Sequence, residues 1–279
     1  MGNRGNLYAV MGNPIEHSLS PYIHPLFAAQ CNRSIEYEKI CVALDGFPAA
    51  ATSFFARPRA RGLNITVPFK QQAYRLCALL STRAQQAGAV NTIYHQSEDL
   101  YGDNTDGAGL VRDIEQNLCW EIDNKNIVVL GAGGAVRGIL PALLEKSEVK
   151  IKVLNRTLEK ALDLKKQFPE IEVAPLIGAD GSITQPIDLL INGTSAFLNA
   201  EAFVLPQMIF NPNALAYDLI YSAQNTPFME WAKLKGATAV SDGLGMLVEQ
   251  AAESFALWES FHPETASVIE AMRKKLTTA

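Results

Sequence analysis

The feature that most constrains this chain is an apolar segment, Asn126–Leu130, that leads directly into a glycine-rich turn. Its apolar character is continuous rather than alternating, which is typical of a strand buried on both faces of a parallel sheet. Gly131, Gly133 and Gly134 follow it, and Val136–Glu145 then has the pattern of an amphipathic helix. The order of strand, glycine turn and helix therefore predicts a parallel α/β unit around residue 131.

Short apolar strands alternate with amphipathic helices along the rest of the chain as well. The other strands are expected at Leu7–Gly12, Glu36–Val42, Leu63–Val67, Val90–Tyr94, Asp99–Gly102, Val149–Leu154, Asp188–Ile191 and Ala214–Leu219, with the fourth and fifth forming a hairpin. The other helices are expected at Pro21–Cys31, Phe47–Arg57, Gln71–Leu80, Gly107–Asn117, Leu158–Phe168, Gly245–Glu259 and Pro263–Lys275. This alternation favours an α/β fold over a sandwich or a helical bundle.

Length and composition indicate two ordinary globular domains. The chain has 279 residues, and a domain averages about 150, so roughly two domains are expected. Hydrophobic residues make up 48% and charged residues 19%, which excludes a disordered chain. The formal charge is 24 − 29 = −5, so a chain-wide electrostatic attraction to nucleic acid is not expected.

Neither a membrane segment nor a metal or disulfide framework is indicated. No apolar run approaches the ~18 residues that a membrane-spanning helix needs. Cys31, Cys41, Cys77 and Cys119 are widely spaced and have no nearby histidine pair, so they are expected to be buried free thiols rather than zinc ligands or disulfides. These observations lead us to expect a cytoplasmic protein.

The glycine turn has the features of a dinucleotide-binding loop. One glycine would make the tight turn, another would let the backbone approach the pyrophosphate, and the helix N-terminus would supply free N–H donors. The third small position of the usual pattern falls on Val136, although Ala135 beside it can serve the close packing. The alternative is a glycine-rich strand-to-helix turn with no ligand.

The end of the next strand distinguishes between nicotinamide cofactors. NAD sites usually carry an acidic residue there for the ribose 2′-hydroxyl, but this chain has Asn155-Arg156-Thr157. An arginine can bond the oxygens of a 2′-phosphate in pairs, so NADP(H) is favoured. Lys160 is either a second phosphate partner or a surface lysine, and Arg156 itself could instead be a solvated charge at a helix terminus.

Polar residues gather where strands of the N-terminal half end. They lie in the segments Gly12–Pro21, Asn64–Lys70, Gly88–Thr92 and Gly102–Gly107. Ser18 and Ser20 could converge on a carboxylate, although Ser20 is also well placed to cap the following helix. Together these segments outline a pocket for a small polyhydroxylated acid that faces the nicotinamide.

Each further polar residue also has a plainer interpretation. Lys70, which follows Pro68 closely, would lie at the mouth of the sheet where a proton donor belongs, but a lone lysine is most often on the surface. Asp106 could be a helix N-cap and Asn91 a turn residue. Near the C-terminus, Gln250 lies among apolar residues, where a buried amide needs partners such as substrate hydroxyls.

The motifs in this order resemble those of the shikimate dehydrogenase family over most of the chain. They are Ser18–Pro21, Asn64–Lys70, Gly88–Thr92, Gly102–Gly107, Gly131–Ala135, Asn155–Thr157 and Asp242–Gln250. The resemblance implies NADPH-dependent reduction of 3-dehydroshikimate to shikimate in aromatic amino-acid biosynthesis. It also implies a substrate domain of residues 1–106 plus 243–279 and an inserted Rossmann-type domain of residues 107–242.

The resemblance also assigns roles to individual residues. Lys70 and Asp106 would be the catalytic pair beside the reacting oxygen. Substrate would be held by Ser18, Ser20 and Tyr221 at its carboxylate and by Thr66, Asn91 and Gln250 at its ring hydroxyls. The cofactor would be held by Gly131, Ala132, Gly133, Gly134, Ala135, Asn155, Arg156, Thr157, Lys160, Leu219 and Gly243, and no metal is implied.

Two departures from the family pattern concern the cofactor side, and three other functions stay open. Lys160 stands where NADP-preferring members often carry a second arginine, and Gly193 stands where alanine is more usual. The alternatives are a quinate/shikimate dehydrogenase with relaxed NAD(P) use, a methylenetetrahydrofolate dehydrogenase, and a non-catalytic NADP(H)-binding paralogue. Shikimate or its 3-keto form is the expected small-molecule partner, and either a monomer or a homodimer is compatible with the sequence.

Overall fold

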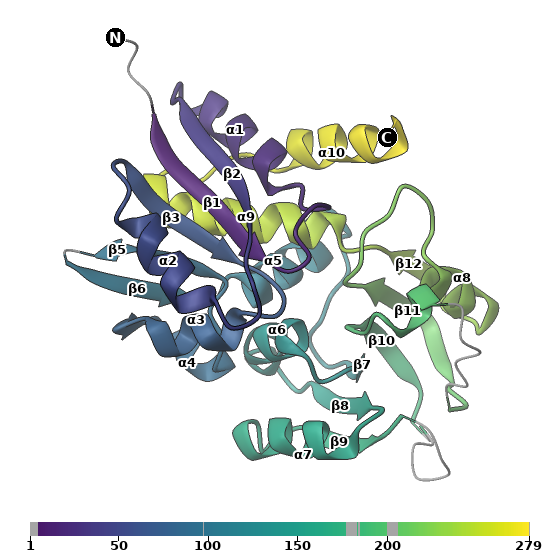
Figure 1. The fold of residues 1–279 in the computed structure, drawn as a ribbon. Coiled ribbons are helices and arrows are strands. Elements are labelled where there is room, and N and C mark those ends of the chain that lie inside the picture. Colours follow the sequence, from purple (N-terminus) through teal and green to yellow (C-terminus); the bar gives the residue numbers. More distant parts are fainter. Residues whose placement is uncertain (1–4, 97, 177–182, 184, 200–205, 279) are drawn as a thin grey trace.

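The chain forms two β-sheets, each covered by helices on both faces (Figure 1). The computed structural model describes residues 5–96, 98–176, 183, 185–199 and 206–278. The first sheet has the order β2-β1-β3-β5-β6-β4 and is built from residues 6–103. The second has the order β12-β11-β10-β7-β8-β9 and is built from residues 126–241. The prediction of an α/β chain with two domains is confirmed.

The first sheet is mixed in strand direction. Its strands are β1 (Asn6–Gly12), β2 (Ile35–Cys41), β3 (Ala60–Ile65), β4 (Leu79–Leu80), β5 (Thr92–Gln96) and β6 (Asp99–Asp103). β1 runs parallel to β2 and β3, whereas β5 is antiparallel to both β3 and β6. The antiparallel β5–β6 pair confirms the expected hairpin. Residues that follow β1, β3 and β6 therefore approach the same region from different strands.

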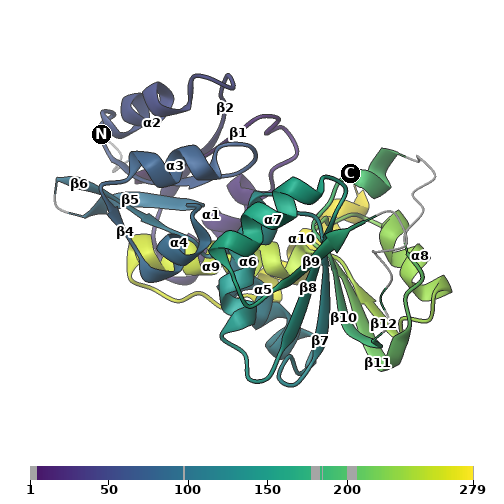
Figure 2. The ribbon, with the colours of Figure 1, turned by 90° about the horizontal axis from the view of Figure 1, so that it is seen from below.

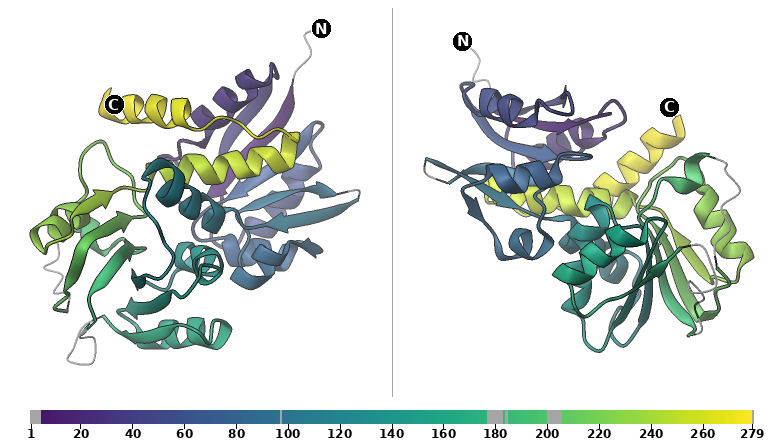
Figure 3. Two further views of the ribbon diagram at one scale, coloured as in Figure 1. Left: turned by 180° about the vertical axis from the view of Figure 1, so that it is seen from behind. Right: turned by 60° about the horizontal axis from the view of Figure 1, so that its bottom comes forward.

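Helices cover both faces of this first sheet. One face packs on α2 (Phe47–Phe55), α3 (Lys70–Leu76) and α4 (Thr82–Ala87) through a core that includes Phe54, Leu63 and Phe69. On the other side, α1 (Ser20–Gln30) packs with the two C-terminal helices, α9 (Leu244–Glu259) and α10 (Ala266–Thr278). The left view of Figure 3 shows these two helices returning to lie beside α1. The chain thus ends against the sheet with which it began.

The second sheet is parallel throughout its described pairs. Its strands are β7 (Asn126–Leu130), β8 (Lys150–Asn155), β9 (Glu172–Pro175), β10 (Ile187–Asn192), β11 (Phe210–Asp218) and β12 (Ala239–Ser241). One face packs on α5 (Asp106–Arg112), its π-helical continuation (Asp113–Asn117), α6 (Gly134–Leu144) and α7 (Leu158–Gln167). α8 (Pro227–Leu234) covers the other face, as Figure 2 shows, and a 3₁₀ turn (Ala196–Asn199) lies between β10 and β11.

Ion pairs and hydrogen bonds connect α9 to the helix that follows the first sheet. Arg112 at the end of α5 contacts Glu253 of α9 at 2.6 Å. One turn later, the Asn117 amide donates to Glu249 of α9 at 2.9 Å. α9 therefore packs on α5 and its continuation as well as on α1, and this holds the start of α9 near the ends of both sheets.

The prediction from sequence missed several elements or gave them other bounds. The expected helix Gln71–Leu80 ends at Leu76, because Cys77 is extended and Leu79 pairs with β6. A further helix, α4, begins after Ser81, whose side chain accepts from the Ala84 N–H. β9, β12 and α8 were not predicted, and the last helix begins at Ala266 rather than Pro263. The missed elements α4, β9, α8 and β12 are short, so the hydrophobic pattern of each is weak.

The prediction of buried thiols is wrong for most of the cysteines. All four are free, but Cys41 and Cys119 are exposed and Cys31 is half-buried. Only Cys77 of the four is buried, and burial raises the pKa of its thiol to about 12. The error arises because cysteine was treated as a small core residue, whereas Cys41 lies on the edge strand β2, where outward positions face solvent.

Candidate active site

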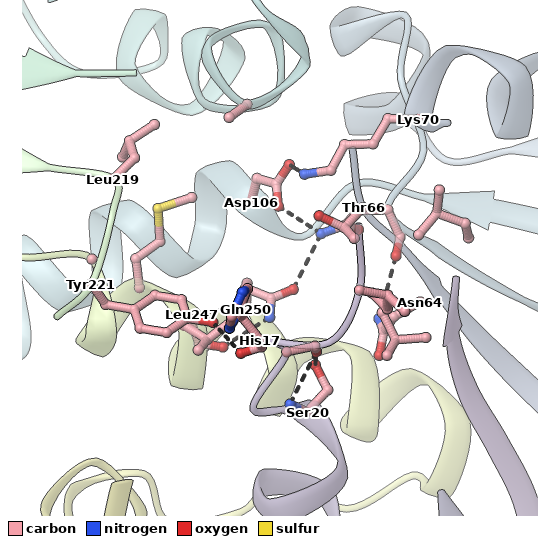
Figure 4. A pocket seen from close by; sticks show the side chains of 18 of the residues that line it. His17, Ser20, Asn64, Thr66, Lys70, Asp106, Leu219, Tyr221, Leu247 and Gln250 are labelled. Carbon is pink, nitrogen blue, oxygen red and sulfur yellow. Dashed lines mark hydrogen bonds and ion pairs between the residues drawn. The ribbon is translucent and has the colours of Figure 1, made fainter. Parts of the chain in front are cut away.

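A pocket of about 330 Å³ lies where β1, β3, the loop before α5 and the start of α9 meet (Figure 4). It collects residues that are far apart in the sequence, from Val10 near the N-terminus to Gln250. Lys70, Asp106, Ser18, Ser20, Thr66, Asn91, Tyr221 and Gln250, the residues expected to serve catalysis and substrate binding, all line it. The fold therefore brings this part of the predicted site together in one cavity.

Lys70 and Asp106 form an ion pair in this pocket. Each is the first residue of a helix, α3 and α5 respectively, and Lys70 Nζ lies 2.5 Å from Asp106 Oδ2. The Lys70 side chain is 12% exposed and that of Asp106 is 6% exposed. The two plainer interpretations are therefore wrong: Lys70 is not a surface lysine, and the N-cap of α5 is Thr105 rather than Asp106. The Asp106 carboxylate is directed at a cation instead.

The Asn91 side chain is hydrogen-bonded to Asp106 and to the residue before it. Its buried amide nitrogen donates to Asp106 Oδ1 at 2.8 Å and to Thr105 Oγ1 at 2.9 Å. Its amide oxygen accepts from the Thr105 N–H at 2.9 Å. The turn interpretation of Asn91 is therefore incomplete, because its side chain connects the chain directly before β5 to Thr105 and Asp106 at the start of α5. Each oxygen of the Asp106 carboxylate thus has its own donor.

Ser18, Ser20 and Tyr221 form another side of the pocket. The two serine hydroxyls lie 3.3 Å apart, and the Tyr221 hydroxyl donates to the His17 carbonyl at 3.3 Å. Burial raises the pKa of Tyr221, so the phenol stays a neutral donor at physiological pH. The expectation that Ser20 caps α1 is wrong, because the N-cap is Leu19 and no side chain caps this helix. Both serine hydroxyls therefore face each other at the pocket.

Thr66 and Gln250 complete the expected polar lining, and Asn64 is an addition that sequence reasoning missed. The Gln250 side chain donates to the Leu247 carbonyl at 2.8 Å and accepts from Asn91 at 3.3 Å. Asn64 also lines the pocket, and its side-chain oxygen accepts from the Tyr37 hydroxyl at 2.7 Å. Its position two residues before Thr66 was the available signal, because alternate residues of a strand share one face.

A second pocket, of about 380 Å³, opens beside the first and shares Lys70 and Ala135 with it. Its walls include the turn Ala132–Ala135 on one side and Val67, Pro68 and Gln71 on the other. Lys160 and Arg137 also line it. A long ligand lying on the glycine turn would therefore reach the Lys70–Asp106 pair without leaving the protein surface.

The glycine turn fits the pyrophosphate of a dinucleotide. Gly131 has φ +106°, a backbone conformation that favours glycine, and its N–H donates to the Leu154 carbonyl of β8. A Cβ on Gly133 would meet no atom within 4 Å, so the surface above the turn is open. No side chain caps α6, which leaves the first N–H groups of this helix available to an anion.

The remaining predicted cofactor residues lie at the end of β8 and beside the first pocket. Asn155 is the last residue of β8, which pairs directly with β7, and its amide donates to the carbonyl of Thr157 at 2.7 Å. Arg156 is exposed. Leu219 and Gly243 line the first pocket and touch each other, since a Cβ on Gly243 would lie 2.4 Å from the Leu219 carbonyl oxygen. Asn155, Arg156 and Thr157 line neither of the two pockets.

The described residues show neither a cluster suited to a metal ion nor a helix suited to a membrane. Within the described ranges, no group of three or more His, Cys, Asp and Glu residues is arranged to hold a metal ion. No helix in the described part of the chain is both long enough and apolar enough to cross a bilayer.

Three family models match successive parts of the chain. The shikimate dehydrogenase substrate-binding domain matches residues 10–93, the shikimate/quinate 5-dehydrogenase model matches residues 113–202, and the shikimate 5′-dehydrogenase C-terminal domain matches residues 243–273. The first and third models lie on the two parts of the chain that meet at the first sheet. The second lies on the parallel sheet and its glycine turn.

Curated relatives match nearly the whole chain. The shikimate dehydrogenase (NADP(+)) of Alkalilimnicola ehrlichii is 49% identical over 266 residues, which are 95% of this chain and 98% of that protein. The shikimate dehydrogenase (NADP(+)) of Herminiimonas arsenicoxydans is 48% identical over 279 residues, which are 99% of this chain and 100% of that protein.

Solved structures share the fold over the same length. An Ael1 enzyme from Pseudomonas putida is 40% identical with a TM-score of 0.83 and covers 98% of both chains. The shikimate 5-dehydrogenase of Thermus thermophilus, solved with NADP(H) and shikimate, is 33% identical with a TM-score of 0.83 and covers 97% of this chain and 100% of that one. Sequence, fold and site geometry therefore agree, and this chain belongs to the shikimate dehydrogenase family.

Proposed function

We propose that the protein is an NADP(H)-dependent shikimate dehydrogenase, which interconverts 3-dehydroshikimate and shikimate. The observation that carries this proposal is the position of the Lys70–Asp106 ion pair, which stands where the substrate-sized pocket joins the pocket of the glycine turn. A ketone held in the first pocket would have its oxygen beside an ammonium group. NADPH, when bound, would supply the hydride for this carbonyl.

The protein's own residues would supply a proton to the substrate oxygen and hold the proton donor in place. As the carbonyl is reduced, its oxygen becomes an alkoxide, and the Lys70 ammonium donates a proton to it or stabilises its charge. The Asp106 carboxylate holds Lys70 Nζ in place, and it is itself held by the Asn91 amide. In the reverse direction, one member of the Lys70–Asp106 pair accepts the single proton of the substrate hydroxyl. Side chains with less than one-eighth of their surface exposed would also limit access of water to the reacting atoms.

The rest of the pocket would hold the acid and its hydroxyl groups. Ser18, Ser20 and Tyr221 offer three hydroxyl donors to a carboxylate, and Thr66 and Gln250 offer bonds to ring hydroxyls. Asn91 would act mainly by holding Thr105 and Asp106 in place, because its amide is already bonded to these two residues. We include Asn64 among the substrate-side residues because it lines the same pocket.

The cofactor side would use both the turn and the residues after β8. The backbone of residues 131–135 and the N-terminus of α6 would bind the pyrophosphate, with Leu219 and Gly243 near the nicotinamide end. Asn155, Arg156, Thr157 and Lys160 would bind the 2′-phosphate, which selects NADP(H) over NAD(H). We also propose residues 1–106 plus 243–279 as the substrate domain and 107–242 as the cofactor domain, with the protein acting in the cytoplasm as a monomer or homodimer.

An initial-rate assay tests this function directly. Shikimate and quinate are each crossed with NADP and NAD, and nicotinamide absorbance is followed. Turnover confined to shikimate with NADP is the expected result. Comparable rates with quinate or NAD would assign the protein to the relaxed quinate/shikimate branch. Cofactor binding without turnover of either acid would indicate a non-catalytic paralogue and overturn the proposal.

A further inference from the structure

Ser254 lies one helical turn beyond Gln250 on α9 and does not line the substrate pocket. Its side chain is fully buried, with 0% exposure. A buried hydroxyl is costly unless it is bonded, because it gives up its bonds to water. The Ser254 hydroxyl is therefore expected to have hydrogen-bond partners within the protein.

Four polar groups from four parts of the chain surround this hydroxyl. Ser254 Oγ lies 2.7 Å from Thr92 Oγ1 on β5 and 3.3 Å from Thr105 Oγ1 in the loop before α5. It accepts from the Asn64 amide of β3 at 3.1 Å, and it is 3.1 Å from the Gln250 carbonyl. Ser254 thus connects α9 to two strands and to the loop that carries Asp106.

The side chains of Asn91, Thr105, Ser254 and Thr92 form a closed ring of hydrogen-bonding contacts. The Asn91 amide nitrogen donates to Thr105 Oγ1, and Thr92 Oγ1 donates to the Asn91 amide oxygen. Either hydroxyl can donate in the Thr105–Ser254 contact and in the Ser254–Thr92 contact, and the Ser254 hydroxyl can also donate to the Gln250 carbonyl. Loss of one hydroxyl therefore takes a hydrogen-bond partner from its neighbours in the ring.

The ring bears on the catalytic pair through Asn91. The same Asn91 nitrogen that donates to Thr105 also donates to Asp106 Oδ1 at 2.8 Å, and the other oxygen of Asp106 contacts Lys70. Resting on the function proposed above, we propose that Ser254 is a positioning residue, which fixes Asn91 and through it the Asp106 carboxylate that holds Lys70. Ser254 touches neither substrate nor cofactor pocket.

The test is a double-mutant cycle between Ser254→Ala and Asp106→Asn, measured with shikimate and NADP. Ser254→Ala alone is expected to lower kcat by about three- to tenfold, the range for losing one bonded partner, while KM for shikimate changes less. In the Asp106→Asn background, Ser254→Ala is expected to lower kcat less than twofold, because the carboxylate that Ser254 positions is already absent. Equal, multiplicative losses in both backgrounds would overturn the proposal.

Thr265→Ala is the matched control. The Thr265 hydroxyl donates to Glu249 of α9 at 2.6 Å, and neither residue lines the substrate pocket. This variant is expected to lose stability comparable to that of Ser254→Ala and to keep its kcat. A loss of kcat in Thr265→Ala that tracks the fall in unfolding midpoint would assign the Ser254 effect to general stability instead.

Thr92→Val keeps the test decisive if Ser254→Ala does not fold. It removes the next hydroxyl of the ring at constant shape, and it should show the same coupling to Asp106→Asn. The unsubstituted enzyme separates the two proposals: no turnover of shikimate by it contradicts the proposed function. Turnover without coupling in the cycle contradicts only the role of Ser254.

Discussion

The Val136 side chain occupies the space that a Cβ on Gly193 would need. Such a Cβ would lie 2.4 Å from Val136 Cγ2 and 3.2 Å from the Leu130 carbonyl oxygen. Val136 lies in the first turn of α6, and Gly193 directly follows β10, so α6 and the chain after β10 are in close contact at the end of the parallel sheet. Valine at position 136 therefore packs in this structure because position 193 has no side chain.

Gly193→Ala is expected to destabilise the protein by about 1–3 kcal/mol, because the added methyl group meets a stiff β-branched side chain and a backbone oxygen. Urea unfolding of the variant measures the loss. Val136→Ala opens the same space, so the double variant should be more stable than the sum of the single changes predicts. Additive losses would show that the two positions do not compensate.

Lys70→Ala is expected to lower turnover about 10²–10⁴-fold, the usual contribution of a positioned general acid. Binding of NADPH should stay nearly unchanged, which a fluorescence titration checks. Lys166→Ala is a suitable control, because the Lys166 side chain is 79% exposed and, among the described residues, its ion pair is with the exposed Asp163 one turn earlier. Turnover of Lys70→Ala close to that of the unsubstituted enzyme would contradict the assignment.

Ser18→Ala is expected to raise KM for shikimate with little change in kcat. A hydroxyl that binds the carboxylate does so equally in the ground state and in the transition state, so its loss weakens both. The Ser18 hydroxyl bonds only to Ser20 among the described residues, which makes disturbance of the fold small. Initial rates over a range of shikimate concentrations measure both constants, and a selective fall in kcat would argue against this role.

Arg156→Ala is expected to raise KM for NADP about tenfold, the scale of a lost hydrogen bond to a charged group. KM for NAD should not change, because NAD has no 2′-phosphate. Binding of 2′,5′-ADP by calorimetry provides a readout that does not depend on turnover. Arg57→Ala, which removes an exposed arginine paired with Glu38 in the first sheet, is the control. Equal effects on both cofactors would contradict selection by Arg156.

Stability is expected to fall as the pH drops below about 6.5, through His24. This imidazole is fully buried, and burial lowers its pKa from 6.5 to about 3. Between these values the unfolded chain binds the proton and the folded chain does not, so acidification favours unfolding by up to about 1.4 kcal/mol per pH unit. Urea unfolding at pH 7, 6 and 5 measures the slope.

His24→Phe removes this titration and keeps an aromatic ring against Tyr37, which stacks on His24 with ring centres 4.5 Å apart. The slope between pH 6.5 and 5 should therefore flatten in this variant, whatever its stability at pH 7. An unchanged slope would assign the pH dependence to other groups.

Sequence patterning was sufficient for the long elements and for most of the pocket. Asn126–Leu130 was predicted with the bounds that β7 has, because a strand buried on both faces has an unambiguous apolar run. Lys70, Asp106 and Ser18 could be named because polar residues gather in loops at strand ends, and Gln250 because it lies among the apolar residues of a helix. Short elements such as α4, α8 and β12 were missed because so few residues carry little periodicity.

The sequence by itself determined the alternation of strands and helices, the glycine turn and the types of polar side chain available, because these depend on local periodicity and backbone preference. Tertiary structure alone decided which of these residues meet. The Lys70–Asp106 pair joins positions 36 residues apart, and Ser254 meets Thr92 across a separation of 162 residues. Such contacts depend on how α9 returns to the first sheet, and no local pattern encodes that distance.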